Sequence, residues 1–207
     1  MSKMNTQSLI DAVNNATSAL TLLKSVQALA EQQDPAAIST LIAVLGYNNP
    51  GAAVAAVDGL ISLGQVVVPQ LLEQVDGYNY GARAWAVRVF AGIGDPRALD
   101  LLITSALEDF SPSVRRAAAK GLGNILWSQL PPQDIAKAQQ KVLDSLFLTL
   151  NDGEWIVRYA GVVGLESLGK SNPTLIESIT TKLTEIKQQE PEITIKSRID
   201  LALVNFV

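Results

Sequence analysis

The side chains best suited to chemistry gather in one short segment, between positions 78 and 88. It holds two tyrosines, a tryptophan and two arginines, in a chain that is only 5% aromatic. Aromatic rings can bind a flat conjugated ligand, and guanidinium groups can bind its carboxylates. Residues three apart share one face of a helix. The segment therefore favours a binding surface, whose members are Tyr78, Tyr80, Arg83, Trp85 and Arg88.

Two further residues extend this surface along the chain. Arg116 and Tyr159 each follow directly after an arginine in a repeated pattern, so they occupy equivalent positions in two repeats. We expect their helices to lie side by side on the inner wall of a stack. The alternative is that Trp85 and Trp155 only fill gaps between alanine-rich helices. For Trp155 we favour this packing role.

A third candidate is Asp58, which shares its repeat position with Arg88 and Lys120. The alternating charge of these three residues indicates a string of ion pairs on a solvated face. Alternatively, the Asp58 carboxylate would accept hydrogen bonds from pyrrole-type N–H groups of a ligand.

Several classes of protein are excluded or disfavoured by composition. The chain has no histidine and no cysteine, so Ser-His and Cys-His nucleophile systems and His/Cys zinc sites are excluded, and we expect no metal site. No phosphate-binding Gly-x-x-x-x-Gly-Lys-Ser/Thr loop is present. With 16 basic and 20 acidic residues, the net charge of −4 argues against nucleic-acid binding.

These candidates are positioned by an internal repeat. An acid, then Val-Arg six residues later, then Gly-Leu six residues after the arginine, occurs from Asp109 and again from Asp152. A looser copy starts at Asp76, and the Gly-Leu position or its equivalent recurs at 59, 89, 121 and 164. Such spacing is typical of stacked helical hairpins. The acid can bridge to the arginine of its own or the next repeat, so we predict a structural ladder of Asp76, Asp109, Arg115, Asp152 and Arg158.

Helical periodicity and capping signals predict the hairpins themselves. Residues 9–30 read as two helices of an irregular first repeat, and Asp34-Pro35, Asp95-Pro96 and Asn172-Pro173 open later helices. We predict these helix pairs: 35–45 with 50–63, 69–75 with 81–93, 96–107 with 111–126, 133–150 with 154–168, and 173–188 with 193–206. No segment alternates with period two, so essentially no sheet is expected.

We interpret residues 1–207 as one repeat domain, with an irregular repeat at 1–33, regular repeats at 34–170 and capping helices at 171–207. The apolar end, Ile199 to Val207, lacks a polar cap, so it either folds back on its own repeat or lies against another chain. No apolar run approaches the roughly 20 residues of a membrane span, and no secretory segment begins the chain. We expect a cytoplasmic protein without membrane insertion.

The two strong repeats, starting at Leu107 and Leu150, resemble HEAT-like repeats of the phycobilisome lyase type. The stretch Asp76-Gly-Tyr-Asn-Tyr-Gly-Ala-Arg-Ala-Trp-Ala-Val-Arg resembles, more specifically, the smaller, F-type subunit of the heterodimeric E/F phycocyanobilin lyases of cyanobacteria. The resemblance covers most of residues 34–170. It implies an all-α solenoid of about five to six HEAT-like hairpins, curved with a concave inner face.

The resemblance also implies a function. With a larger E-type subunit, the chain would bind phycocyanobilin as substrate, without a cofactor, and deliver it to a cysteine of the phycocyanin α-subunit as a thioether. Isomerising relatives depend on a His-Cys pair, so no isomerase activity is expected here. The alternatives are a bilin-detaching protein of phycobilisome breakdown and a non-catalytic scaffold that binds proteins.

Site roles follow from this implied function. The acceptor's thiol would be the nucleophile, so the lyase would only hold and orient the pigment. Arg83 or Arg88, with Arg116, would bind the propionates, and the rings would lie against Tyr80 and Trp85, with Tyr159 nearby. Asp58 or Tyr78 would supply hydrogen bonds to the pyrroles or transfer a proton.

Overall fold

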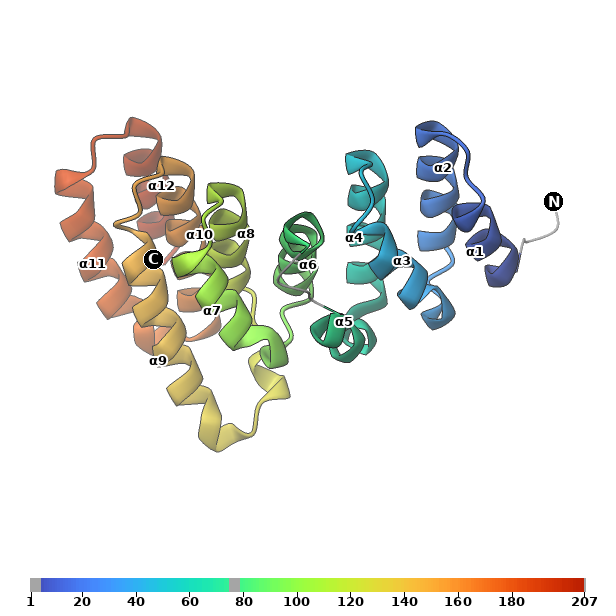
Figure 1. The fold of residues 1–207 in the computed structure, drawn as a ribbon. Coiled ribbons are helices and arrows are strands. Elements are labelled where there is room, and N and C mark those ends of the chain that lie inside the picture. Colours follow the sequence, from blue (N-terminus) through green and yellow to red (C-terminus); the bar gives the residue numbers. More distant parts are fainter. Residues whose placement is uncertain (1–4, 75–78, 207) are drawn as a thin grey trace. The chain divides into compact units, whose positions relative to one another are not determined.

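The computed structural model describes residues 5–74 and 79–206, and in these ranges every regular element is an α-helix or a short 3-10 helix. The helices follow one another as antiparallel hairpins (Figure 1), which confirms the predicted all-α hairpin array. The chain divides into two compact units, Met1–Ile93 and Gly94–Val207, and each is described by itself. The single domain and the concave face across the whole array stay predictions.

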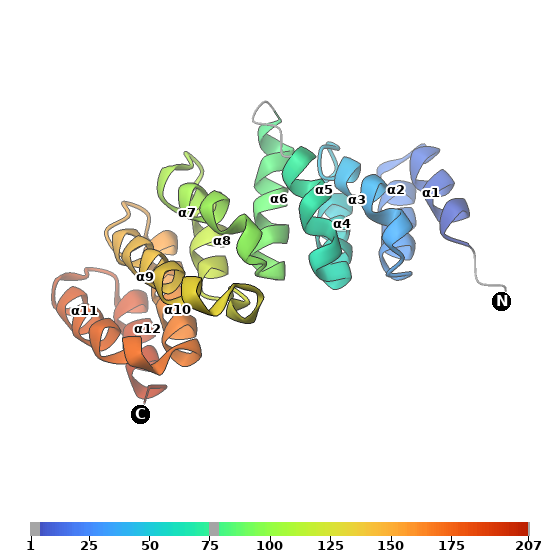
Figure 2. The ribbon, with the colours of Figure 1, turned by 90° about the horizontal axis from the view of Figure 1, so that it is seen from below.

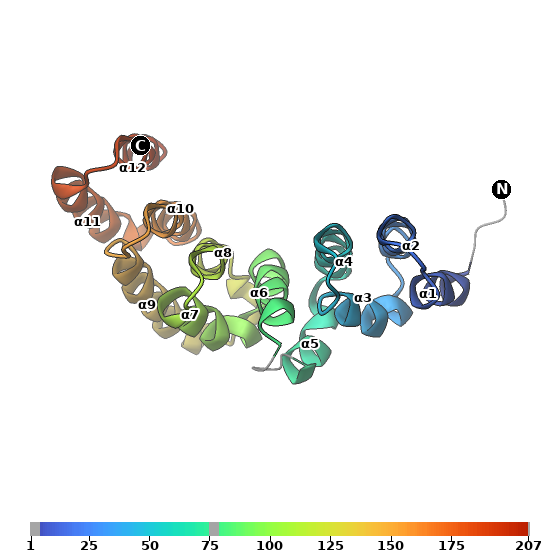
Figure 3. The same cartoon turned by 45° about the horizontal axis from the view of Figure 1, so that its top comes forward.

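The first unit contains three hairpins. Its helices are α1 (Thr6–Asn14), α2 (Ala19–Ala30), α3 (Ile38–Val44), α4 (Pro50–Leu63), α5 (Val68–Gln74) and α6 (Tyr80–Ile93). The second helices of the hairpins, α2, α4 and α6, form one layer, and α1, α3 and α5 form the other (Figure 3). In this layer α4 packs against both α2 and α6, so successive repeats share one apolar core.

The second unit repeats the arrangement. Its helices are α7 (Leu99–Glu108), α8 (Pro112–Leu122), α9 (Pro132–Thr149), α10 (Trp155–Ser171), α11 (Ile176–Gln189) and α12 (Ile193–Val204). Helix α10 packs against α8 on one side and α12 on the other, whereas α7, α9 and α11 form the opposite layer. Figure 2 shows the α11–α12 hairpin at the end of this unit, beside α9 and α10.

Helix starts lie where the capping signals predict them. The side chains of Asp34, Asp95 and Asn172 each accept a hydrogen bond from the backbone two residues later, and the proline that follows begins a 3-10 turn leading into a helix. Asn49 caps α4 by accepting from the Ala52 amide at 3.0 Å. Helix α4 ends at Leu63, and the next residue, Gly64, has a φ of 73° in the left-handed region that glycine tolerates.

The repeated glycine marks close contacts between second helices. A Cβ on Gly164 in α10 would lie 2.6 Å from the carbonyl oxygen of Ala119 in α8 and 2.8 Å from a methyl of Leu146. A Cβ on Gly59 in α4 would lie 2.6 Å from the Cβ of Ala30 in α2. At these two positions of the repeat period, glycine therefore lets adjacent repeats approach closely.

The prediction that the helix starting near Ser111 continues to residue 126 is wrong, because α8 ends at Leu122. The residue after it, Gly123, lies against the backbone of Gly164, where a Cβ would be 2.6 Å from the Gly164 carbonyl oxygen. The chain then turns, and the Leu126 amide donates to the Gly94 carbonyl at 2.8 Å. This tertiary hydrogen bond takes the place of the next helical one.

The expectation about apolar runs is also corrected. The stretch Pro50–Gln74 has the length and apolar composition of a membrane span: an 18-residue segment of it has a mean hydropathy of 1.7, and half of that segment is buried. In the structure Gly64 interrupts this stretch, and its two halves, α4 and α5, belong to different layers. The apolar residues serve the core of the first unit.

The C-terminal helix packs on its own repeat, as the first of the two alternatives for the apolar end predicts, and contact of its exposed face with another chain stays a prediction. Ile199 and Ala202 of α12 are fully buried, and the Asn205 side chain donates to the Glu166 carboxylate of α10 at 2.7 Å. Leu201 and Val204, on the other side of α12, remain exposed.

Candidate functional site

Helix α6 carries four of the predicted pigment-binding residues, all half-buried. The guanidinium carbon of Arg88 lies 4.3 Å from the centroid of the Trp85 ring. That of Arg83 lies 5.8 Å from the centroid of the Tyr80 ring. Each arginine thus lies within cation–π range of an aromatic ring. Two predicted residues of the preceding turn, Asp76 and Tyr78, lie outside the described residues.

Asp58 lies exposed on α4, in the same unit as α6. It lines a shallow cavity of about 260 Å³ together with the polar side chains of Gln27 and Glu31. The described lining of this cavity includes no residue of α6. The structure therefore places Asp58 beside another acid, Glu31, in a cavity lined by α2 and α4.

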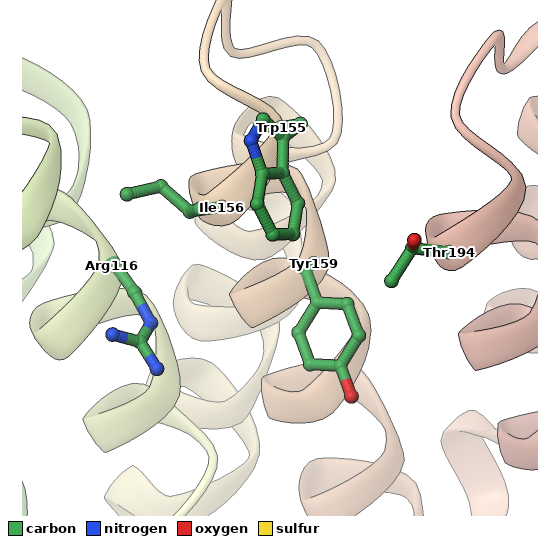
Figure 4. Close-up of a pocket in the computed structure, with 5 residues that line it drawn as sticks. All are labelled: Arg116, Trp155, Ile156, Tyr159 and Thr194. Atoms are coloured by element: carbon green, nitrogen blue, oxygen red, sulfur yellow. The ribbon is translucent and has the colours of Figure 1, made fainter.

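The second unit holds a larger cavity, of about 420 Å³, formed by α8, α10 and the start of α12. Figure 4 shows Trp155 and Tyr159 one turn apart on α10, with the Arg116 side chain beside them on α8 and Thr194 on α12. Ile156 completes the lining. The structure thus brings Arg116 and Tyr159 together, as their equivalent repeat positions predict.

Trp155 belongs to this cavity, and the prediction that it fills a gap between helices is wrong. The side chain is 46% exposed, because Trp155 is the first residue of α10 and shares the open face of that helix with Tyr159. Trp127 is the tryptophan with the packing role: it is 9% exposed, and its Nε1 donates to the Ser171 hydroxyl at 3.1 Å.

A second cavity, of about 430 Å³, continues between α10 and α12 and shares Tyr159 and Thr194 with the first. Its other lining residues are Ile193, Ser197, Arg198 and Leu201. The Arg198 guanidinium carbon lies 6.0 Å from the centroid of the Tyr159 ring. Sequence reasoning missed Thr194 and Arg198, because α12 does not repeat the motif of α8 and α10.

Beside these cavities runs the series of ion pairs. Arg115 donates from Nε to Asp152 Oδ2 at 2.7 Å and from Nη1 to the Asp109 carbonyl at 2.8 Å. Arg158 uses the same geometry one repeat later, with Nη1 on the Asp152 carbonyl at 2.9 Å and two bonds of 2.9 Å to Glu190. Each arginine therefore joins the loop before its own helix to the acid of the next repeat.

The electrostatics of these pairs favour the charged state. Burial opposes ionisation of Asp152 and Glu190, but the hydrogen bonds from Arg115 and Arg158 outweigh it and hold the pKa of each carboxyl below its ordinary value. Glu190 was absent from the predicted ladder. A signal for it exists in the chain: like Asp109 and Asp152, it lies three residues before the start of a second helix.

Comparison with known proteins identifies the family to which these repeats belong. The HEAT repeats family matches residues 68–166. The chain is 50% identical over 197 residues to "Phycocyanin alpha phycocyanobilin lyase CpcF" of Synechocystis sp., covering 95% of this chain and 92% of that protein. It is 51% identical to "Phycocyanobilin lyase subunit beta" of Nostoc sp., covering 95% and 98%.

The chain belongs to the phycocyanobilin lyase β-subunit family. A solved structure agrees: one chain of the complex of CpcE and CpcF of phycocyanin lyase from Nostoc sp. PCC7120 matches with 53% identity and a TM-score of 0.77, over 82% of this chain and 99% of that one. The HEAT-like solenoid and the resemblance to the F-type subunit are thereby confirmed.

Within this lyase subunit, the described residues offer two aromatic and cationic surfaces, on α6 and on α8–α10–α12. Among the residues that the structure describes, no three acidic side chains lie in an arrangement that could hold a metal ion. Both surfaces combine arginine side chains with aromatic rings.

Proposed function

We propose that this chain is the smaller subunit of a heterodimeric bilin lyase, which acts in the cytoplasm with a larger E-type subunit. The pair would attach phycocyanobilin through a thioether bond to a cysteine of the phycocyanin α-subunit. One observation carries the proposal: nearly the whole chain aligns, at 50% identity, with a protein named as a phycocyanin α phycocyanobilin lyase. The match to a chain of the complex of CpcE and CpcF supports the E-type partner.

The residue inventory suits an addition reaction in which the lyase has no nucleophile. The acceptor's thiol adds across the ethylidene double bond of the pigment: sulfur bonds to the exocyclic carbon, the thiol proton is transferred to the pigment, and no group leaves. The chain has no cysteine and no histidine, so its contribution is to hold the pigment and to expose one face of the ethylidene group. Orientation of this kind can account for large rate effects.

Two surfaces support pigment binding. Arg116 would bind a propionate while the rings of Trp155 and Tyr159 contact the conjugated system in the 420 Å³ cavity. On α6, the Trp85–Arg88 and Tyr80–Arg83 pairs offer a ring and a guanidinium each. Asp58, whose side chain is exposed, or Tyr78 would supply hydrogen bonds to the pyrroles or transfer a proton.

The test is reconstitution by co-expression with bilin-forming enzymes, the E-type subunit and the apo-α-subunit of phycocyanin. A covalent, fluorescent α-subunit that appears only when both lyase chains are present supports attachment. Loss of pigment from the holo-α-subunit supports detachment instead. An unchanged absorbance spectrum when phycocyanobilin is added to the E–F complex contradicts both pigment functions and favours a protein-binding scaffold.

A further inference from the structure

Arg198 in α12 has an unusual combination of burial and bonding. Its side chain is 10% exposed, and its Nη2 donates to the Glu166 carboxylate of α10. Its Nη1 is buried and has no hydrogen-bond partner in the described part of the chain. Nearly all buried donors in folded proteins are paired, so an unpaired guanidinium nitrogen beside a cavity indicates an acceptor from outside the chain. Arg198 lines the 430 Å³ cavity between α10 and α12.

The charge around Arg198 also favours an anion. Glu166 is 6% exposed and is held by three donors: Arg198, Lys170 at 2.5 Å and Asn205 at 2.7 Å. One carboxylate therefore faces two cations, and the cluster of Glu166, Lys170 and Arg198 carries a net charge of +1. A guanidinium that shares its counter-ion with a lysine retains the capacity to bind a second carboxylate.

The shape of the surface indicates a long, flat ligand. The cavity at Arg198 and the cavity at Trp155 have Tyr159 and Thr194 in common, so together they form one groove along α10, which we call the α10 groove. Tyr159 lies at its middle, Arg198 in one cavity and Arg116 in the other. The exposed apolar side chains of Ile193 and Leu201 border the Arg198 cavity. Each cavity has the size of an ordinary small-molecule site.

We propose that Arg198 binds one of the two propionates of the open-chain tetrapyrrole. The inference rests on the bilin lyase function proposed above and deepens it. The conjugated rings lie over Tyr159 along the α10 groove, and Arg116 at the other end of the groove faces the second propionate. Arg198 thus completes a site for a planar dicarboxylate within the second unit of this chain.

The test compares phycocyanobilin with its dimethyl ester, in which both carboxylates are blocked. The complex of this chain with its E-type subunit is titrated with each pigment, and affinity is read from the absorbance change. In Arg198→Gln we expect about tenfold weaker binding of the free acid, the effect of one lost charge-assisted bond, and unchanged binding of the ester. Arg198→Lys should recover part of the loss, because it keeps the charge.

Two controls separate binding from folding. Lys182→Gln removes a cation of α11 that pairs with Glu185 and does not line the α10 groove, so the affinity for both pigments should stay unchanged. If Arg198→Gln does not fold, the double variant Glu166→Gln/Arg198→Gln removes the buried carboxylate as well, and the same comparison applies to it.

Three results for Arg198→Gln would overturn the assignment. The first is equally weakened binding of acid and ester, and the second is no weakening of either. The third is weaker association with the E-type subunit, while the subunits that stay associated bind pigment as before. The last would mean that a protein partner covers the groove. If the unsubstituted complex attaches pigment in the co-expression assay while Arg198→Gln binds normally, the lyase function stands and this assignment alone fails. If the unsubstituted complex does not bind pigment, both fail.

Discussion

The ion pair between Arg158 and Glu190 offers a measurable test of how the repeats are held together. The Arg158 side chain is 13% exposed and that of Glu190 only 2%, and two hydrogen bonds of 2.9 Å join α10 to the connection between α11 and α12. In Arg158→Ala the Glu190 carboxylate would stay buried and lose its cation. Removing one partner of a buried pair typically costs about 3–5 kcal/mol. Since the Glu192 amide still donates to Glu190, we expect about 3 kcal/mol.

This loss should appear in thermal unfolding followed by circular dichroism at neutral pH. For a chain of this size, about 3 kcal/mol corresponds to a decrease in Tm of roughly 6–12 °C. The double variant Arg158→Ala/Glu190→Gln removes the uncompensated charge and should recover a large part of the loss. The matched control is Lys182→Ala, which breaks a more exposed pair with Glu185 on α11 and should cost under about 1 kcal/mol.

A Tm decrease below about 2 °C for Arg158→Ala would refute the reasoning, since it would mean that solvent or another group compensates Glu190. A double variant no more stable than Arg158→Ala would also contradict it. In that case the stabilisation would come from the hydrogen bonds of Arg158 to the Asp152 and Gly153 carbonyls, and the Glu190 pair would contribute little.

Three other predictions follow from the same contacts. Gly164→Ala should lower the free energy of unfolding by about 1–3 kcal/mol in urea denaturation, because the new methyl group would lie 2.6 Å from the Ala119 carbonyl oxygen. The control Gly153→Ala places its methyl group in open space and should leave the free energy of unfolding unchanged. Burial raises the pKa of Glu166, but the hydrogen bonds from its three donors outweigh burial and lower this pKa from 4.5 to about 2. The stabilisation that ionised Glu166 provides is therefore present at neutral pH and is lost as the pH falls from about 4.5 to 2. Glu166→Gln should flatten the dependence of Tm on pH in that range. Trp85→Ala or Arg88→Ala should reduce pigment transfer to the α-subunit several-fold in the co-expression assay, with nearly unchanged helicity and Tm. A decrease in Tm as large as that of Arg158→Ala would instead show that the Trp85–Arg88 pair has a packing role.

Local signals in the chain predict most of the helices, because each signal acts within a few residues. The Asp-Pro and Asn-Pro pairs mark where helices begin, since the capping side chain and the proline act on the next turn. The prediction for α8 is wrong at its end for the opposite reason. Its end depends on a hydrogen bond to Gly94 and a contact with Gly164, neither of which is near in sequence.

The candidate site likewise contains residues that the sequence predicts and residues that only the packing of the helices reveals. Equivalent repeat positions predict that Arg116 and Tyr159 meet, because second helices stack in register. The pattern does not extend to α12, so Arg198 and Thr194 have no equivalents to reveal them. The exposure of Trp155 depends on which face of α10 is left uncovered, and the helices packed against α10 decide that.

Taken alone, the order of the residues determines the repeat period, the starts of the helices, the absence of thiol and imidazole chemistry, and the resemblance to the F-type lyase subunit. These depend on composition and on spacing within one or two helical turns. Only the tertiary structure decides that Glu190 closes the ion-pair series, that Trp155 stands in a cavity, and that Arg198 holds an unpaired donor beside Tyr159. Each of these requires side chains about thirty or more residues apart to be packed together, and the pairing of such distant groups is set by the way the helices stack.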